Sequence, residues 1–325
     1  MEHAIEADGL VKSYPKGVTA LDGLSFAVAP GSVFALLGPN GAGKSTAVKI
    51  LTTLAKPDAG AATVAGIDVI SSPDRVRRTI GVVAQGSAVD IQATGRENLR
   101  LQGQIHGMGS RPPRAIEPRA QELLERFGLA DAADRIVRGY SGGMQRRLDI
   151  AMALVHDPAV LFLDEPTTGL DPEVRADMWA EIARLAAEGG KSVLLTTHYL
   201  EEADQLAERI AIVDRGRVVA QGTPDELKRE LRGDAIHVDL EREYNGAVSG
   251  ALAGLPAVRD VTVDGRTLRA RADDGGRAVP LVLGALESHG VGVASVRVAR
   301  PSLDDVYLKY TGRTFDAAEA EATTR

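Results

Sequence analysis

The residues from Gly38 to Ser45, GPNGAGKS, match the pattern G-x-x-x-x-G-K-[ST]. Glycines let a backbone close around phosphate oxygens with its N–H groups pointing inward. Lys44 would pair with β- and γ-phosphate oxygens, and the hydroxyl of Ser45 would bind Mg²⁺. The same glycines could form only a flexible strand-to-helix turn. Because an apolar strand precedes the loop and a helical pattern follows it, the segment predicts a site for a nucleotide and Mg²⁺.

Two acids end a second apolar strand, Leu161-Phe162-Leu163-Asp164-Glu165. Asp164 would hold Mg²⁺ through water, and Glu165 would orient or deprotonate an attacking water. The alternative is a solvated strand end, which would be the better interpretation of an isolated Asp-Glu pair. A phosphate loop in the same sheet favours the catalytic interpretation.

A second glycine-rich helix start, Tyr140-Ser141-Gly142-Gly143-Met144-Gln145, lies further along the chain. Ser141 is a good N-cap, and an ordinary helix start would explain it. Free N–H groups at a helix N-terminus also suit a phosphate. Since the chain already has one phosphate loop, a second phosphate-binding segment would serve another nucleotide or the nucleotide of a partner chain. This indicates a site shared between two chains.

Short apolar runs alternate with helical patterns before residue 232, which predicts a parallel sheet covered by helices. A stretch without strand signals, residues 94–155, is predicted to be a helical insert with a break at Arg111-Pro112-Pro113. The expected strands are Ser32–Leu37, Ile80–Val83, Val160–Leu163 and Ser192–Leu195, and the expected helices are Lys44–Leu54 and Pro172–Glu188.

The pattern changes after residue 232 to strand, helix, strand, strand, helix, strand, which predicts a ferredoxin-like α+β domain over 233–314. Its expected elements are Ala235–Leu240, Val248–Leu255, Val258–Val263, Thr267–Ala272, Arg277–His289 and Val291–Ala299. Residues 315–325 are rich in Ala, Glu and Thr and are predicted to be a flexible tail. The sequence thus divides into 1–232, 233–314 and the tail.

Composition narrows the function classes. The formal net charge of −7 argues against a nucleic-acid binder, and the absence of Cys excludes disulfide and thiolate chemistry. No apolar run approaches the roughly 18 residues that a membrane span needs. Any membrane role is therefore expected to depend on a partner.

These motifs resemble those of an ABC transporter nucleotide-binding subunit, from Ala4 to about Leu231. The resemblance implies a P-loop NTPase core with an antiparallel N-terminal β subdomain, and ATP held with Mg²⁺ between two copies in a head-to-tail homodimer. It also implies a separately encoded integral-membrane permease and a place on the cytoplasmic face of the membrane. Residues 85–104 would contact the permease, with apolar contacts from Ala88, Val89, Ile91 and Leu99.

The resemblance also implies the roles of individual residues. Glu165, His198, Gln85 and Lys44 would be catalytic, and Ser45, Gln85 and Asp164 would hold the metal. Tyr14 would stack on adenine and Asp171 would cross the dimer interface, although Asp171 could also only cap a helix. The nucleotide-binding residues would be Tyr14, Gly38, Pro39, Asn40, Gly41, Ala42, Gly43, Lys44, Ser45, Thr46, Ser141, Gly142, Gly143 and Asp171.

Three further segments resemble daunorubicin-resistance-type exporter ATPases: Tyr140-Ser141-Gly142-Gly143-Met144, the run from Thr197 to Asp204, and Pro301–Tyr307. This resemblance implies export of an antibiotic, a drug or another hydrophobic compound. Two other classes are a soluble ATPase that remodels nucleic acid or ribosomes and a regulatory nucleotide-binding module without turnover. The remodelling ATPase is disfavoured because the chain has a single set of motifs, no Cys and no sustained heptads. The regulatory module is disfavoured because it would give Glu165, Gln85 and His198 little reason to occur together.

Overall fold

The structure is a computed structural model that describes residues 2–15, 17–108, 116–187, 189–231, 233–244, 252, 254–255 and 258–323. The chain divides into two compact units. Unit 1 comprises residues 1–224 and 315–325, and unit 2 comprises residues 225–314. In the described part of the chain, no helix is long and apolar enough to cross a membrane.

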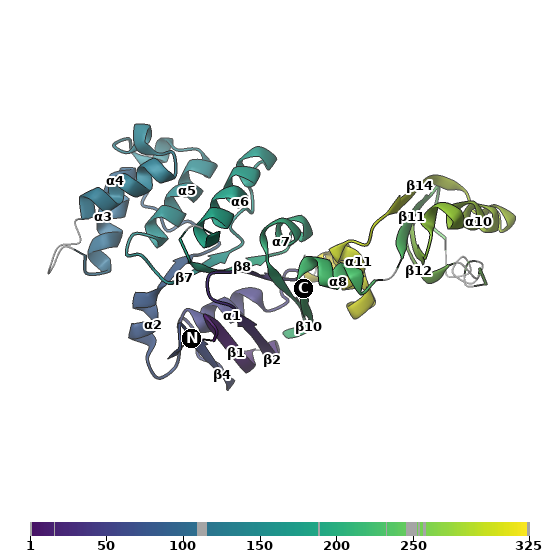
Figure 1. Ribbon diagram of the computed structural model, residues 1–325, viewed down its shortest axis with the longest axis horizontal. Helices are drawn as coiled ribbons and strands as arrows, with labels where there is room; N and C mark the ends of the chain where they lie inside the picture. The colour runs from purple at the N-terminus through teal and green to yellow at the C-terminus, as the bar shows by residue number, and fades with distance from the viewer. Residues whose placement is uncertain are drawn as a thin grey trace. The chain divides into compact units, whose positions relative to one another are not determined.

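Unit 1 is built on a sheet of mostly parallel strands in the order β10-β9-β3-β8-β7-β6, with only β10 antiparallel to its neighbour (Figure 1). The residues of β3 and β8 are buried without exception, because helices cover a parallel sheet on both faces. Its strands are β3 (Val33–Leu37), β6 (Ile80–Val83), β7 (Val160–Asp164), β8 (Ser192–Thr197), β9 (Arg209–Asp214) and β10 (Arg217–Gly222).

A second, antiparallel sheet in unit 1 has the order β2-β1-β4-β5 and confirms the expected N-terminal β subdomain. It shares a core with the parallel sheet, in which Phe26 of β2 stacks on Phe34 of β3 with ring centroids 5.4 Å apart. Its strands are β1 (Ile5–Tyr14), β2 (Val18–Val28), β4 (Ala59–Val64) and β5 (Ile67–Asp68).

The helical insert is confirmed, since residues 94–155 contain helices and no strand among those described. Helix α3 begins at a capping box in which Thr94 and Glu97 exchange hydrogen bonds, and α3, α4 and α5 pack together (Figure 1). The expected break at Arg111-Pro112-Pro113 lies outside the described residues. The helices of the insert are α3 (Gly95–Ile105), α4 (Ile116–Arg126), η1 (Ala130–Ala132), η2 (Val137–Gly139) and α5 (Gly142–Ala153).

The remaining helices of unit 1 connect its strands, and α12 returns from the end of the chain. The tail predicted over 315–325 is instead helix α12 over Phe315–Thr323, because Phe315 and Ala318, three residues apart on one helix face, are both buried. These helices are α1 (Lys44–Leu51), α2 (Pro73–Thr79), α6 (Pro172–Ala187), α7 (Leu200–Leu206) and α12 (Phe315–Thr323).

Unit 2 contains an antiparallel sheet in the order β12-β13-β11-β14, which is the strand order expected of a ferredoxin-like domain. Helix α10 covers one face through Ala278, Val282 and Leu286. Most of the helix expected over Val248–Leu255 lies outside the described residues. The elements are α8 (Pro224–Arg229), β11 (Asp234–Leu240), β12 (Arg259–Asp264), β13 (Thr267–Ala272), α10 (Gly275–Ser288), β14 (Val293–Ala299) and α11 (Leu303–Thr311).

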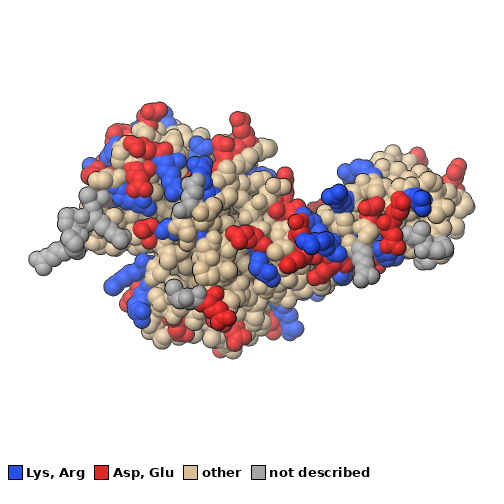
Figure 2. Space-filling view, in the orientation of Figure 1, with Lys and Arg blue, Asp and Glu red and all other residues tan. Residues whose placement is uncertain are grey.

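Charged side chains of both signs lie next to one another on the face of the molecule drawn in Figure 2. In the helical insert, Arg96 pairs with Asp134 at 2.8 Å and Arg119 with Glu122 at 2.7 Å. Such exposed pairs each contribute about 0–1 kcal/mol. They keep the surface mixed in charge and add little to stability.

Candidate functional site

The glycine-rich loop lies between β3 and α1, at the carboxyl edge of the parallel sheet. Its glycines are required by geometry: Gly43 has φ +108°, and a Cβ there would lie 2.4 Å from the carbonyl oxygen of Ala20. A Cβ on Gly38 would lie 2.3 Å from the carbonyl oxygen of Val213. Only glycine lets the loop run this close to β9 and β2.

Lys44 is buried at the start of α1, with 4% of its surface exposed. Its Nζ donates to the carbonyl oxygens of Gly38 at 2.6 Å and Pro39 at 3.0 Å, and it lies 3.7 Å from Oε1 of Glu165. Burial lowers the pKa of Lys44, while nearby carboxylates, first that of Glu165, oppose this shift. The ammonium group is therefore held over the loop, next to the acid that the sequence predicted to be catalytic.

Glu165 directly follows β7 in a left-handed backbone conformation, with φ +49°. Such a conformation costs a non-glycine residue about 1–3 kcal/mol. It is held by β8, because the backbone N–H of Glu165 donates to the Oγ1 of Thr196 at 3.1 Å and to its carbonyl oxygen at 3.2 Å. The strain turns the carboxylate of Glu165 back toward the glycine-rich loop.

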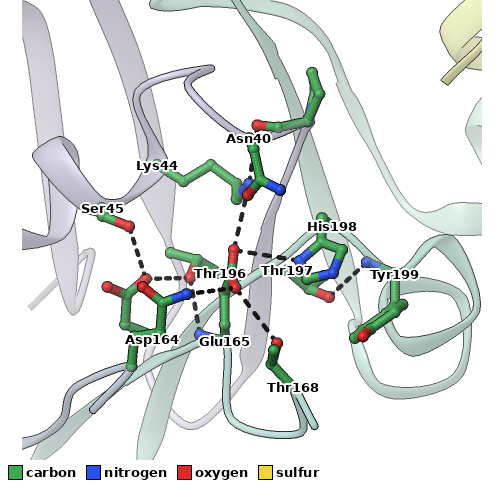
Figure 3. Close-up of polar contacts among 12 residues, drawn as sticks. Asn40, Lys44, Ser45, Asp164, Glu165, Thr168, Thr196, Thr197, His198 and Tyr199 are labelled. Atoms are coloured by element: carbon green, nitrogen blue, oxygen red, sulfur yellow. Dashed lines mark hydrogen bonds and ion pairs between the residues drawn. The ribbon is translucent and has the colours of Figure 1, made fainter. Parts of the chain in front are cut away.

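Side chains from separate segments converge on the Glu165 carboxylate (Figure 3). Its Oε1 lies 3.3 Å from Nδ1 of His198, and its Oε2 accepts from Nε2 of Gln85 at 3.2 Å and from Oγ1 of Thr168 at 3.3 Å. Contact with His198 and the charge of Lys44 hold the pKa of Glu165 below its usual range. Glu165 is therefore an ionised carboxylate at neutral pH, the form that a general base needs.

The oxygen atoms proposed for a metal lie beside this cluster. Oδ1 of Asp164 accepts from Oγ of Ser45 at 3.2 Å and from Oγ1 of Thr196 at 2.5 Å (Figure 3). A hydroxyl and a carboxylate are hard donors that suit Mg²⁺, which usually takes few protein ligands and completes its shell with water and phosphate oxygens. The described residues contain no group of three or more His, Asp or Glu side chains that could hold a metal ion.

The glycines after Ser141 begin α5 on the helical insert. Ser141 caps the helix, accepting from the N–H of Met144 at 3.2 Å, and a Cβ on Gly143 would lie 2.6 Å from Cγ1 of Val174. Asp171 likewise caps α6, accepting from the N–H of Val174 at 2.9 Å. In the described residues, no hydrogen bond joins Ser141 or Asp171 to Lys44 or Glu165.

Tyr14 ends β1 and is half-exposed, with its ring centroid 5.9 Å from Nζ of Lys12. None of the described hydrogen bonds joins it to the glycine-rich loop. The structure thus brings together Lys44, Ser45, Gln85, Asp164, Glu165 and His198. None of the described hydrogen bonds joins Tyr14, Ser141 or Asp171 to these six residues.

The sequence did not predict the role of Arg146 in α5. Its guanidinium, 8% exposed, donates to the carbonyl oxygens of Ala84 at 2.8 Å and Pro166 at 2.7 Å, and to those of Asp164 and Glu165 at 3.2 Å. Arg146 therefore joins the helix after Ser141 to the backbone on both sides of Glu165 and to the residue before Gln85. The sequence did hold one signal for this role: the charged Arg146 shares a helix face with the apolar Ile150 and Ala153.

A second unpredicted residue, Glu319 of α12, lies on the glycine-rich loop. Its carboxylate accepts from the backbone N–H of Asn40 at 2.9 Å and from Nδ2 of Asn40 at 2.8 Å. Burial lowers the pKa of Lys44, and the charge of Glu319, after that of Glu165, opposes this shift. An acidic side chain from the end of the chain thus occupies loop donors that a phosphate group would use.

Comparisons with known proteins give sequence matches in both units. The sequence profile of the ABC transporter family matches residues 21–168, and that of the ATP-binding protein DrrA1-3-like C-terminal domain matches residues 222–311. The daunorubicin resistance ATP-binding protein DrrA3 of Streptomyces coeruleorubidus is 51% identical, over 95% of this chain and 96% of its own. The Nod factor export ATP-binding protein I of Ralstonia nicotianae is 40% identical, over 95% of this chain and 94% of its own.

Solved structures are similar as well. The protein cbiO1 from Clostridium perfringens, part of the ABC transporter complex cbiONQ, has a TM-score of 0.65 at 26% identity and covers 79% of this chain and 97% of its own. A dimeric ATP-binding cassette with ADP and Pi has a TM-score of 0.61 at 28% identity, over 67% of this chain and 98% of its own.

Proposed function

Because this chain belongs to the ATP-binding subunits of ABC transporters, and is an ABC-type ATPase, we propose that it powers a drug exporter from the cytoplasmic face of the membrane as a head-to-tail homodimer. The observation that carries the proposal is the convergence of Lys44, Gln85 and His198 on Glu165 beside the glycine-rich loop. This arrangement fits hydrolysis, because a bound nucleotide would place its terminal phosphate next to an ionised base.

Each residue then has a defined task. Glu165 accepts a proton from, or orients, the attacking water, and Gln85 and His198 fix the carboxylate from either side. Lys44 and the backbone N–H groups of residues 38–46 stabilise negative charge on the phosphates. Arg146 positions the backbone of Glu165 and does not itself contact the reacting atoms.

Mg²⁺ would be held by Ser45 and Asp164, with the side-chain oxygen of Gln85 as a further ligand. When bound, the ion would neutralise charge on the phosphate oxygens. The hydrogen bond from Thr196 to Asp164 orients the carboxylate that would carry the ion or its water.

The homodimer is supported by the second set of N–H donors after Ser141, because none of the described hydrogen bonds joins that set to the loop at Lys44. In a head-to-tail dimer, the segment Ser141-Gly142-Gly143 of each copy, here called the signature, would complete the site of the other copy. The dimeric form of a solved relative also supports this arrangement. Tyr14 would stack on the adenine, and Asp171 would face the partner copy while capping α6.

A mixed-subunit experiment tests the dimer. A Lys44→Ala protein and a Ser141→Arg protein should each be nearly inactive. A dimer of one copy of each, isolated through two affinity tags, has one site with an intact loop and an intact signature, so part of the wild-type ATPase rate should return. If the verified mixed dimer stays as inactive as its parents, the head-to-tail site is not as proposed.

The permease contact is proposed for the exposed residues of 85–104. The earlier expectation needs one correction: Leu99 is fully buried and unavailable to a partner, whereas Ile91 and Leu101 are 48% and 53% exposed. A short helix of the permease could bind there with its apolar face. Because Gln85 contacts Glu165, nucleotide state could reach this surface.

Crosslinking tests the contact in a chain that has no Cys of its own. Ala88→Cys, at an exposed position next to Gln85, should crosslink to a co-expressed membrane subunit, and Ala59→Cys, exposed on β4, should not. Ala88→Cys adducts with soluble proteins only would contradict the transporter role.

The proposed cargo, an antibiotic or another hydrophobic compound, rests on the names of the relatives. It is tested by which compounds raise the ATPase rate of the intact complex.

A further inference from the structure

Unit 2 contains a cavity of about 460 Å³ that the nucleotide chemistry does not use. Its wall is formed by β12, β13, α11 and the residues that follow α8. The charged residues that line it include Arg259, Asp260, Arg269, Arg271, Asp305 and Lys309. This size is within the range of small-molecule pockets, which is about 300–1,000 Å³.

Arg271 lines the cavity because of the alternation of β13. Leu268, Ala270 and Ala272 face the apolar core under α10, so the residues between them point to the other face of the sheet. Arg271 is only 7% exposed, and its Nε, Nη1 and Nη2 have no hydrogen-bond partner among the described residues. Arginine cannot escape this situation by losing its proton, so it remains a buried, unpaired cation.

The arginines around it are paired, which makes Arg271 an exception. Arg259 lies opposite Arg271 in the register of β12 and β13 and pairs with Asp273 at 2.7 Å, and Arg269 pairs with Asp304. Like charges directly opposite each other destabilise a sheet. Of the two arginines that face each other in this register, only Arg271 has a guanidinium without a hydrogen-bond partner among the described residues.

Two carboxylates near Arg271 reduce this charge without bonding to it. Oδ2 of Asp305 accepts from the backbone N–H and Oγ of Ser302, both at 2.8 Å, and caps α11. Burial lowers the pKa of Arg271, and the charges of Asp305 and Asp260 oppose that shift. These acids also restrict what can enter, because they repel a dianion more strongly than a monoanion.

We propose that this cavity binds a small organic carboxylate, whose two oxygens accept parallel hydrogen bonds from the guanidinium of Arg271. The planar fork of arginine matches a carboxylate in this bidentate geometry. Leu231, Val261 and Leu308 line the same cavity and would contact a short apolar body. Asp260 and Asp305 disfavour a doubly charged phosphate.

Calorimetric titration of the full chain with sodium hexanoate tests the site, with benzoate, hexanamide and inorganic phosphate as comparison probes at matched ionic strength. Hexanoate and benzoate should bind saturably and raise the melting temperature. Hexanamide, which has no charge, should bind at least tenfold more weakly, because a hydrogen bond to a charged group is worth about 1.5–3 kcal/mol.

Variants locate the binding. Arg271→Met should weaken hexanoate binding at least tenfold and should raise the melting temperature of the ligand-free chain, since it removes an unpaired buried charge. Arg271→Lys should retain weak binding, because an ammonium group lacks the fork. Arg297→Lys, at an exposed position on β14 outside the cavity, should behave as wild type.

Three results would overturn the proposal. The first is that neither hexanoate nor benzoate binds saturably. The second is that phosphate binds more tightly than both, and the third is that Arg271→Met binds hexanoate with unchanged affinity. The readouts do not involve ATP, so they are independent of the ATPase function proposed above.

Discussion

Two arginines of this chain are buried to the same degree, Arg146 in unit 1 at 8% exposure and Arg271 in unit 2 at 7%, yet their surroundings are opposite. The guanidinium of Arg146 donates to backbone carbonyl oxygens on both sides of Glu165. That of Arg271 has no hydrogen-bond partner among the described residues.

The difference indicates two uses of a buried cation. Where the acceptors belong to the protein, the charge fixes a local geometry, and here it fixes the strained backbone at Glu165. Where the protein supplies no acceptor, the charge is available to a ligand. Replacement of Arg146 should therefore lower the stability of the chain, whereas removal of the Arg271 side chain should raise it.

The largest effect is expected at Glu165, the residue that Arg146 positions. Glu165→Gln removes the ionised base and should lower the ATPase rate by roughly 10²–10⁴-fold while ATP binding is retained. Steady-state hydrolysis and equilibrium binding of a fluorescent nucleotide measure the two quantities. Glu201→Gln, at an exposed site on α7, is the matched control. A near-normal rate in Glu165→Gln would show that another group is the base.

The second effect is on stability. Arg146→Lys leaves one ammonium group for acceptors on separate segments, so buried carbonyls lose their donor, and the free energy of unfolding should fall by about 2–4 kcal/mol. Urea denaturation measures it. The neighbour Arg147 forms an exposed pair with Asp177 at 2.8 Å, so Arg147→Lys should change stability by less than about 1 kcal/mol. If Arg146→Lys and Arg147→Lys lowered the free energy of unfolding equally, the hydrogen bonds of Arg146 would not be what distinguishes it from Arg271.

His156 shows a third way to bury a titratable group. Its ring stacks on His106 with centroids 3.6 Å apart, and Nε2 donates to the carbonyl oxygen of Ile80 at 2.9 Å. Burial, and then the charge of His106, lower the pKa of His156 to about 4. Unlike an arginine, this side chain avoids an unpaired charge by remaining neutral.

The pH dependence follows from that pKa. The unfolded chain binds the proton of His156 near pH 6.5 and the folded chain only near pH 4, so the free energy of unfolding should fall as pH decreases through this window. After allowance for partial exposure, the loss is about 1 kcal/mol. Denaturation series at pH 7 and pH 4.5 measure it. His156→Gln should reduce the slope and His289→Gln, which is exposed, should not; an unchanged slope in His156→Gln would contradict the pKa argument.

The sequence predicted those features whose residues lie close together along the chain. The glycine-rich loop, Asp164 and Glu165 occupy short motifs. The predicted strands of the parallel sheet follow from continuous apolar runs, and those of unit 2 from local alternation. Arg146 could not be predicted in its role, because its acceptors at Ala84 and Pro166 come from distant segments. Nothing in the sequence singled out Arg271, because its lack of a partner depends on the side chains that pack around β13 in the folded chain.

Helix α12 was missed for a different reason. Its Ala- and Glu-rich composition suggests a solvated tail. In the structure, however, Phe315 and Ala318 are buried and the segment belongs to unit 1. The contact of Glu319 with Asn40 depended on that docking and had no signal of its own in the sequence.

The smallest effect is expected at Glu319, whose carboxylate adds a negative charge where phosphates would bind. Glu319→Gln removes that charge and weakens the competition for the N–H groups of Asn40, so ATP affinity should rise about two- to fivefold, the size expected of a partly exposed charge. The gain should shrink as salt is added.

The control variant is Glu321→Gln, at an exposed position 4.0 Å from Arg215, which should leave the affinity unchanged. Nucleotide titration of the three proteins at low and high salt measures the difference. Unaltered affinity in Glu319→Gln would show that α12 leaves the loop before ATP binds, and the negative charge would then play no part in binding.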